Sequence, residues 1–65
     1  MQEEIIKELR HVGTLIISKA LDYARDAGTE EDEKITVEYE LISDGLMKAV
    51  GIIQERIEEI RREEE

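Results

Sequence analysis

The chain of 65 residues is long enough for one domain at most, which we place at residues 1–65. Its formal net charge is −9, which argues against binding to nucleic acid or anionic lipid, because both need a basic surface. The chain has no cysteine, which excludes disulfides and thiolate metal sites. A lone core below about 70–80 residues rarely supplies enough stability without such a staple, so we expect association with another chain.

Residues 2–27 are predicted to form the first helix, because apolar side chains recur there in steps of three and four. This main stripe consists of Ile5, Leu9, Val12, Ile16, Ala20, Tyr23 and Ala27. Gly28 follows at once and is interpreted as a left-handed helix stop. A second stripe consists of Ile6, Gly13, Ile17, Leu21 and Ala24. The two stripes together are wider than the apolar sector of a helix that covers one small core, so this helix is predicted to contact more than one neighbour.

The segment KITVEYEL, residues 34–41, can be interpreted in two ways. As a helix it continues a long apolar stripe, but it leaves Val37 and Leu41 facing water. As a strand it places Ile35, Val37, Tyr39 and Leu41 on one face. The segment is also rich in β-branched and aromatic residues, so we favour the strand.

The second helix is predicted at about 43–62, with Ser43 as its N-cap, and a polar loop is predicted at 28–33. The expected fold class is therefore α+β, mainly α, with a helix–strand–helix protomer. A lone strand leaves backbone groups unpaired, so it is expected to pair with the same strand of a second subunit across a two-fold axis. The alternative is an all-α helical hairpin that forms a dimeric four-helix bundle. The residues predicted at the oligomer interface are Ile35, Val37, Tyr39, Leu41, Ile6, Gly13, Ile17, Leu21, Ala24 and Gly51.

No combination of residues predicts a catalytic, cofactor-binding or metal site. The acids are plentiful, but those of the first helix occupy solvent-facing positions rather than a cleft. The stretch DAGTEEDE, residues 26–33, lacks the spaced ligands of a calcium loop. Three glycines, Gly13, Gly45 and Gly51, do not match the spacing of a phosphate loop and are attributed to close packing. Tyr23 and Tyr39, the only aromatic residues, are predicted to be core anchors.

The only histidine is His11, in the stretch ELRHVGTLI, residues 8–16. This stretch resembles the dimerisation hairpin of sensor histidine kinases, which carries an exposed histidine on its first helix. The resemblance implies phosphotransfer at His11. Val12 stands where those motifs usually have an acidic residue, and we favour the interpretation of His11 as a surface residue without a chemical role.

The chain combines glutamate-rich helices, charge on its exposed positions, an RREEE end and a lack of both cysteine and proline. In this style it resembles computationally designed homo-oligomeric proteins, and the resemblance implies self-assembly without enzymatic activity. The expected function is that of a homo-oligomer, most simply a C2 dimer. The chain itself is the expected partner, and no cofactor, nucleic acid, membrane or small-molecule ligand is expected.

The alternative function is that of a natural small dimeric adaptor or an antitoxin-like regulator that acts through protein–protein contacts. A ribbon–helix–helix DNA binder is rejected, because the central segment displays Glu38 and Glu40 rather than basic side chains. The stretch MQEEIIKEL at the N-terminus lacks the basic region of a signal peptide. A cytoplasmic location is therefore expected if the protein is natural or is expressed in a bacterial host.

Overall fold

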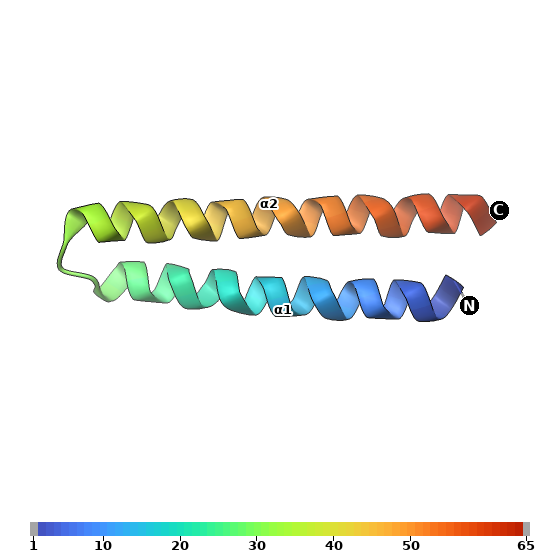
Figure 1. The fold of residues 1–65 in the computed structure, drawn as a ribbon, viewed down its shortest axis with the longest axis horizontal. Coiled ribbons are helices and arrows are strands. Elements are labelled where there is room, and N and C mark those ends of the chain that lie inside the picture. Colours follow the sequence, from blue (N-terminus) through green and yellow to red (C-terminus); the bar gives the residue numbers. More distant parts are fainter. Residues whose placement is uncertain (1, 65) are drawn as a thin grey trace.

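The computed structural model describes residues 2–64 and is a helical hairpin (Figure 1). Helix α1 covers Gln2–Thr29 and helix α2 covers Glu33–Glu64. The helices run antiparallel, with both chain ends at one end of the hairpin, the open end, and the turn of residues 30–32 at the other, the loop end. No strand is present in the described residues, so the predicted helix–strand–helix fold is wrong. The hairpin of the alternative prediction is the fold that the structure has.

The two helices meet along side chains spaced alternately by three and four residues, all of them buried or half-buried. In α1 these positions are Ile6, Leu9, Gly13, Ile16, Ala20, Tyr23 and Ala27. In α2 they are Thr36, Tyr39, Ser43, Leu46, Val50, Ile53, Ile57 and Ile60. An average spacing of 3.5 residues is that of a coiled coil, in which the contact stripe keeps facing the partner helix along its whole length.

A cluster of buried apolar side chains lies between the helices at the open end. Ile6, Ile57 and Ile60 are buried there, and Leu9 and Ile53 pack against them. Large branched side chains from both helices therefore form most of the apolar core at this end. They supply the burial that a helix pair needs to be stable in water.

Toward the loop end, smaller side chains let the helices come close. Ala20 and Ala27 are buried, and the Ser43 hydroxyl donates a hydrogen bond of 2.9 Å from α2 to the backbone carbonyl of Ala20 in α1. The rings of Tyr23 and Tyr39 pack edge to face with their centroids 5.5 Å apart. The prediction that both tyrosines face the core is confirmed.

Helix α2 begins ten residues before the predicted position, because Asp32 caps it. The Asp32 carboxylate accepts a hydrogen bond of 2.9 Å from the backbone N–H of Lys34. The backbone carbonyl of Asp32 accepts a hydrogen bond of 3.0 Å from the backbone N–H of Thr36. This is the geometry of an N-cap, which satisfies N–H groups that the first helical turn leaves free. The predicted N-cap, Ser43, lies inside the helix instead.

The exposed apolar residues of the first turns of α2 explain why the strand was favoured. Val37 is 53% exposed and Leu41 is 64% exposed, as the helical interpretation requires. The core positions of the same segment are held by Thr36 and Ser43, whose hydroxyl groups donate to backbone carbonyls. Because these two contact positions are polar, the apolar residues of the segment do not show a helical period. The N-cap at Asp32 places the start of the helix before this segment.

Helix α1 ends at Thr29, two residues beyond the predicted end. No glycine in residues 2–64 has a positive φ, so the interpretation of Gly28 as a left-handed stop is wrong. The turn is held by Glu30, whose carboxylate accepts hydrogen bonds from the backbone N–H groups of Glu31 and Asp32 at 3.1 and 3.2 Å. The turn after α1 is therefore stabilised by the side chain of Glu30, and not by a left-handed glycine at position 28.

Candidate functional site

A two-helix hairpin has two broad faces, each built from residues that flank the contact stripe on both helices. In an antiparallel pair, equivalent heptad positions of the two helices flank the stripe on the same side. One side, here called the aliphatic face, carries Ile5, Val12, Leu15, Ile42 and Ile52. The opposite side, here called the hollow face, carries Arg10, Ile17, Ala24, Glu40, Met47, Gln54 and Arg61. Neither face is covered by any other part of the hairpin.

The aliphatic face exposes five large apolar side chains. Their exposed fractions are 51% for Ile5, 37% for Val12, 54% for Leu15, 42% for Ile42 and 67% for Ile52. Within residues 2–64, nine large apolar side chains are exposed while six apolar residues are buried. The hairpin therefore leaves more large apolar side chains in water than it buries, and the greater part of them lies on this face.

The hollow face is identified by two depressions in the surface. The hollow near the loop end has a volume of about 270 Å³ and is lined by Ala24, Ala27, Gly28, Glu40, Ser43 and Asp44. A hollow nearer the open end is lined by Arg10, Gln54, Ile57, Glu58 and Arg61. Residues seven apart in a helix lie on nearly the same side of it. The residues between the two hollows, Ile17 in α1 and Met47 in α2, consequently share this face.

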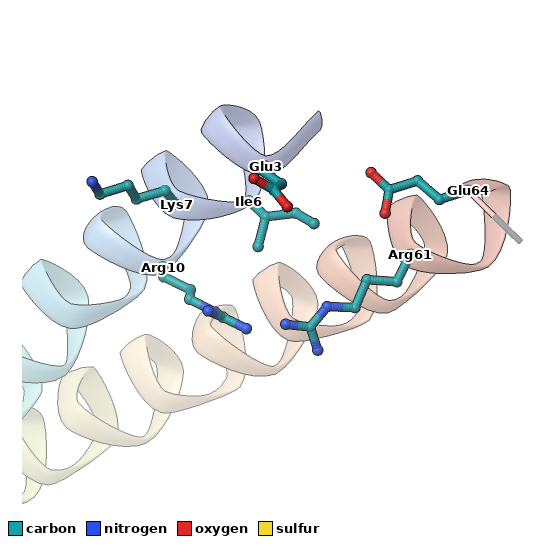
Figure 2. Close-up of a pocket in the computed structure, with 6 residues that line it drawn as sticks. All are labelled: Glu3, Ile6, Lys7, Arg10, Arg61 and Glu64. Atoms are coloured by element: carbon teal, nitrogen blue, oxygen red, sulfur yellow. The ribbon is translucent and has the colours of Figure 1, made fainter. Parts of the chain in front are cut away.

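At the open end itself, a larger hollow of about 510 Å³ is lined by Glu3, Ile6, Lys7, Arg10, Arg61 and Glu64. Figure 2 shows the guanidinium groups of Arg10 and Arg61 directed toward one another from α1 and α2. Within residues 2–64, neither group has a carboxylate oxygen within 4 Å, whereas the other three arginines pair with carboxylates of their own helix. Glu3 and Glu64 line the same hollow but do not pair with these arginines, so the two converging positive charges favour an anionic group between them.

The structure divides the predicted interface residues among four environments. Ile6, Gly13 and Tyr39 belong to the contact between α1 and α2. Ile17, Leu21, Ala24, Val37 and Gly51 lie on or beside the hollow face, and Ile35 flanks the contact stripe on the aliphatic side. Leu41 lies on the outer surface of α2, away from α1. The prediction that α1 has a second apolar stripe next to its core stripe therefore corresponds to the middle of the hollow face.

The glycines make no tight contact within the hairpin. A Cβ added at Gly13 would lie 3.9 Å from Cγ2 of Ile53, which is ordinary van der Waals contact. A Cβ added at Gly45 or Gly51 would meet no atom within 4 Å. The prediction of close packing is therefore wrong for contacts inside the hairpin, and the contact predicted between subunits at Gly51 stays a prediction.

His11 lies on the outer surface of α1 and is exposed. Within residues 2–64, no hydrogen bond or ion pair orients its ring, and no group of three or more histidine and acidic side chains is placed to hold a metal ion. Neither of the two described helices is long and apolar enough to span a membrane. The features that gather side chains from both helices are thus the aliphatic face and the hollows.

Sequence reasoning missed the Arg10 and Arg61 pair and the aliphatic face. The signal that could have found the face is the heptad period, which moves Ile5 and Val12 from the core stripe to its edge. Comparison of the chain with protein-family models, with curated proteins and with solved structures gave no match. The class to which the structure assigns the chain is therefore that of a helical hairpin with uncovered apolar surface.

Proposed function

We propose that the protein is a self-assembling homo-oligomer, most simply a C2 dimer, in which the aliphatic faces of two hairpins pack into a four-helix bundle. The observation that supports this function best is the aliphatic face, with five large side chains that are 37–67% exposed. Apolar surface of this extent on one side of a small protein is typical of an interaction site. Burial of apolar area is also the main driving force for association.

A second copy is the partner that matches the face best. The hairpin extends over 51 Å in length and 14 Å in width, a size comparable with the roughly 800 Å² that each partner contributes to a standard interface. A second copy has helices of the same length as the first copy and carries the same pattern of apolar side chains on its aliphatic face. A two-fold axis brings the patch onto itself, so one set of residues supplies both sides of the contact.

The sides of the aliphatic face carry charged residues, which suits a surface that packs face to face without further growth along its edges. Arg56 on this side is held by Glu59 and Glu63 at 3.1 and 3.7 Å. Such exposed pairs contribute little to stability, but they keep the rim of the patch hydrated. The resulting arrangement is an apolar centre with a polar rim.

The test is the mass of the wild-type chain in solution at micromolar concentration, measured by light scattering after gel filtration. The expected mass is twice the chain mass of 7.5 kDa. Val12→Glu places a charge in the centre of the aliphatic face and is expected to reduce the mass to that of one chain, because an unpaired charge in an apolar contact is costly. A wild-type mass of 7.5 kDa at every concentration would contradict the proposal.

A further inference from the structure

Charge is divided along the hollow face. The open end presents the converging guanidinium groups of Arg10 and Arg61 (Figure 2), whereas the loop end presents the carboxylates of Glu40 and Asp44. Among the described residues 2–64, no basic side chain lines the loop-end hollow. Lys7 also lines the open-end hollow. Three glutamates lie near the two arginines: Glu3 and Glu64 in the outermost turns, and Glu58, which pairs with Arg62 at 3.6 Å. None of the three lies within 4 Å of the guanidinium of Arg10 or Arg61.

Arg10 and Glu40 are placed symmetrically about the middle of the face. In α1, Arg10 and Ala24 stand seven residues to either side of Ile17. In α2, Glu40 stands seven residues from Met47 toward the loop end. Seven residues of helix span about 10 Å, so Arg10 and Glu40 lie at similar distances from the centre, whereas Arg61 stands fourteen residues from Met47, about 21 Å toward the open end. A two-fold axis through the centre would therefore place each end of one copy on the opposite end of another.

We infer that the hollow face is a second contact surface for another copy of this chain, in which the open-end hollow of one copy lies against the loop-end hollow of the other. This inference rests on the proposed self-assembly and extends it, since the aliphatic face joins two chains and the hollow face joins the dimers. The antiparallel orientation brings Arg10 of each copy toward the loop-end carboxylates of the other copy, so the attraction occurs twice in each contact. The parallel orientation brings like charges together and is disfavoured.

The centre of the face supplies the apolar part of this contact. Leu21 is 63% exposed and Met47 is 48% exposed, and Ile17 lies half-buried between the hollows. A methionine is a flexible side chain that adapts to a partner surface. The small residues around the loop-end hollow, Ala24 and Gly28, leave room for an arginine side chain from the other copy.

The net charge of −9 on each chain opposes association at long range. At about 0.15 M salt the Debye length is about 8 Å, so repulsion across the whole molecule is largely screened while groups in contact still attract. The contact is therefore tested by charge reversal at constant ionic strength rather than by varying the salt.

The experiment uses two full-length variants. The basic-end variant carries Arg10→Glu and Arg61→Glu, and the acidic-end variant carries Glu40→Lys and Asp44→Lys. Sedimentation velocity over a concentration series that extends above the micromolar range, where the dimer is expected, is expected to show wild-type species larger than the dimer. Each variant alone is expected to stay dimeric, with larger species needing a concentration at least about tenfold higher, because each contact then joins like charges. An equal mixture of the two variants is expected to restore the larger species, because opposite charges meet again at both ends.

The matched controls reverse the same charges on the outer surface of the helices. Lys34→Glu with Lys48→Glu matches the basic-end variant, and Glu4→Lys with Glu55→Lys matches the acidic-end variant; all four residues are exposed. The controls are expected to assemble as the wild type does. Circular dichroism on every variant checks that the helices remain folded.

Several results would overturn the hollow-face contact. Wild-type species that never exceed the dimer, or variants that assemble alone like the wild type, would contradict it while leaving the proposed dimer intact. A monomeric wild type would overturn both. If charge reversal produced monomers and Val12→Glu did not, the hollow face would be the dimer contact and the aliphatic-face dimer would be wrong. NMR shifts of the Arg10 and Arg61 side chains on addition of inorganic phosphate, without larger species, would instead assign the open-end hollow to a small anion.

Discussion

Replacement of Ile52 by glutamine tests the aliphatic face at its most exposed residue. Ile52 is 67% exposed in the hairpin, so the change is expected to alter the stability of a single hairpin by no more than about 0.5 kcal/mol. Full burial of an isoleucine side chain gains about 1.5–3 kcal/mol, and two-thirds of this, about 1–2 kcal/mol, remains to be gained in the dimer. A C2 dimer contains the residue twice, so the dimer is expected to lose about 2–4 kcal/mol. This loss raises the dissociation constant about 30- to 1000-fold.

The matched control is Leu41→Gln. Leu41 is 64% exposed, nearly as much as Ile52, but it lies on the outer surface of α2 rather than on the aliphatic face. Sedimentation velocity across a dilution series measures the dissociation constants of both variants and of the wild type. Leu41→Gln is expected to leave the constant within about threefold of wild type, which corresponds to the small energies of surface changes.

Equal effects of the two substitutions would refute the reasoning, because apolar exposure alone, and not the position on the face, would then determine association. An unchanged constant for Ile52→Gln would refute the assignment of the contact to this face. Circular dichroism under the same conditions separates a loss of association from a loss of helix.

Three further changes test the hairpin itself. Gly13→Ala is expected to stabilise it by about 1 kcal/mol in thermal unfolding, because alanine is the better helix former and the new methyl group meets Ile53 at an ordinary contact distance; a lower melting temperature would contradict this packing. Asp32→Ala is expected to lower the free energy of unfolding in urea by about 1 kcal/mol through loss of the N-cap bond to Lys34, while Asp32→Asn retains most of it. His11→Ala is expected to change neither folding nor mass, since the side chain is exposed; acid-labile phosphate on His11 in the presence of a kinase would contradict the absence of a chemical role.

The first helix was predictable because its period and its burial agree. Its core stripe carries apolar or small residues at every position, so both the helix and the inward direction of Tyr23 follow from spacing. Its end was predicted two residues too early, because Gly28 was interpreted as the helix stop. In the structure the helix continues through Gly28, and the side chain of Glu30 accepts the hydrogen bonds of the turn. A glycine after an apolar stripe is a common stop, but a helix can also continue through it.

The start of the second helix was predicted ten residues too late for a different reason. Its first turns place Thr36 and Ser43 toward α1 and leave Val37 and Leu41 in water, which inverts the usual relation between polarity and burial. The local pattern was therefore that of a strand with one apolar face. Residues 28–33 were predicted to be a polar loop, so Asp32 was not recognised as the N-cap that its hydrogen bonds to Lys34 and Thr36 show it to be.

The candidate surfaces were predictable only in part. The excess of apolar surface on α1 follows from two stripes on one helix, and Ile17 and Leu21 do remain outside the hairpin core. The meeting of Arg10 and Arg61 depends on the register between two helices, which no single-helix pattern contains. The resemblance to designed proteins, and self-assembly itself, stay predictions.

The central claim, that a second copy covers the aliphatic face, is tested most directly by NMR on a mixture of isotope-labelled and unlabelled chains. Magnetisation transfer between copies then reports contacts across the interface alone. Transfer is expected from the methyl groups of Val12, Leu15 and Ile52 of the labelled chain to the unlabelled chain. Absence of any transfer from these three residues, or transfer confined to Leu41 on the outer surface, would contradict it.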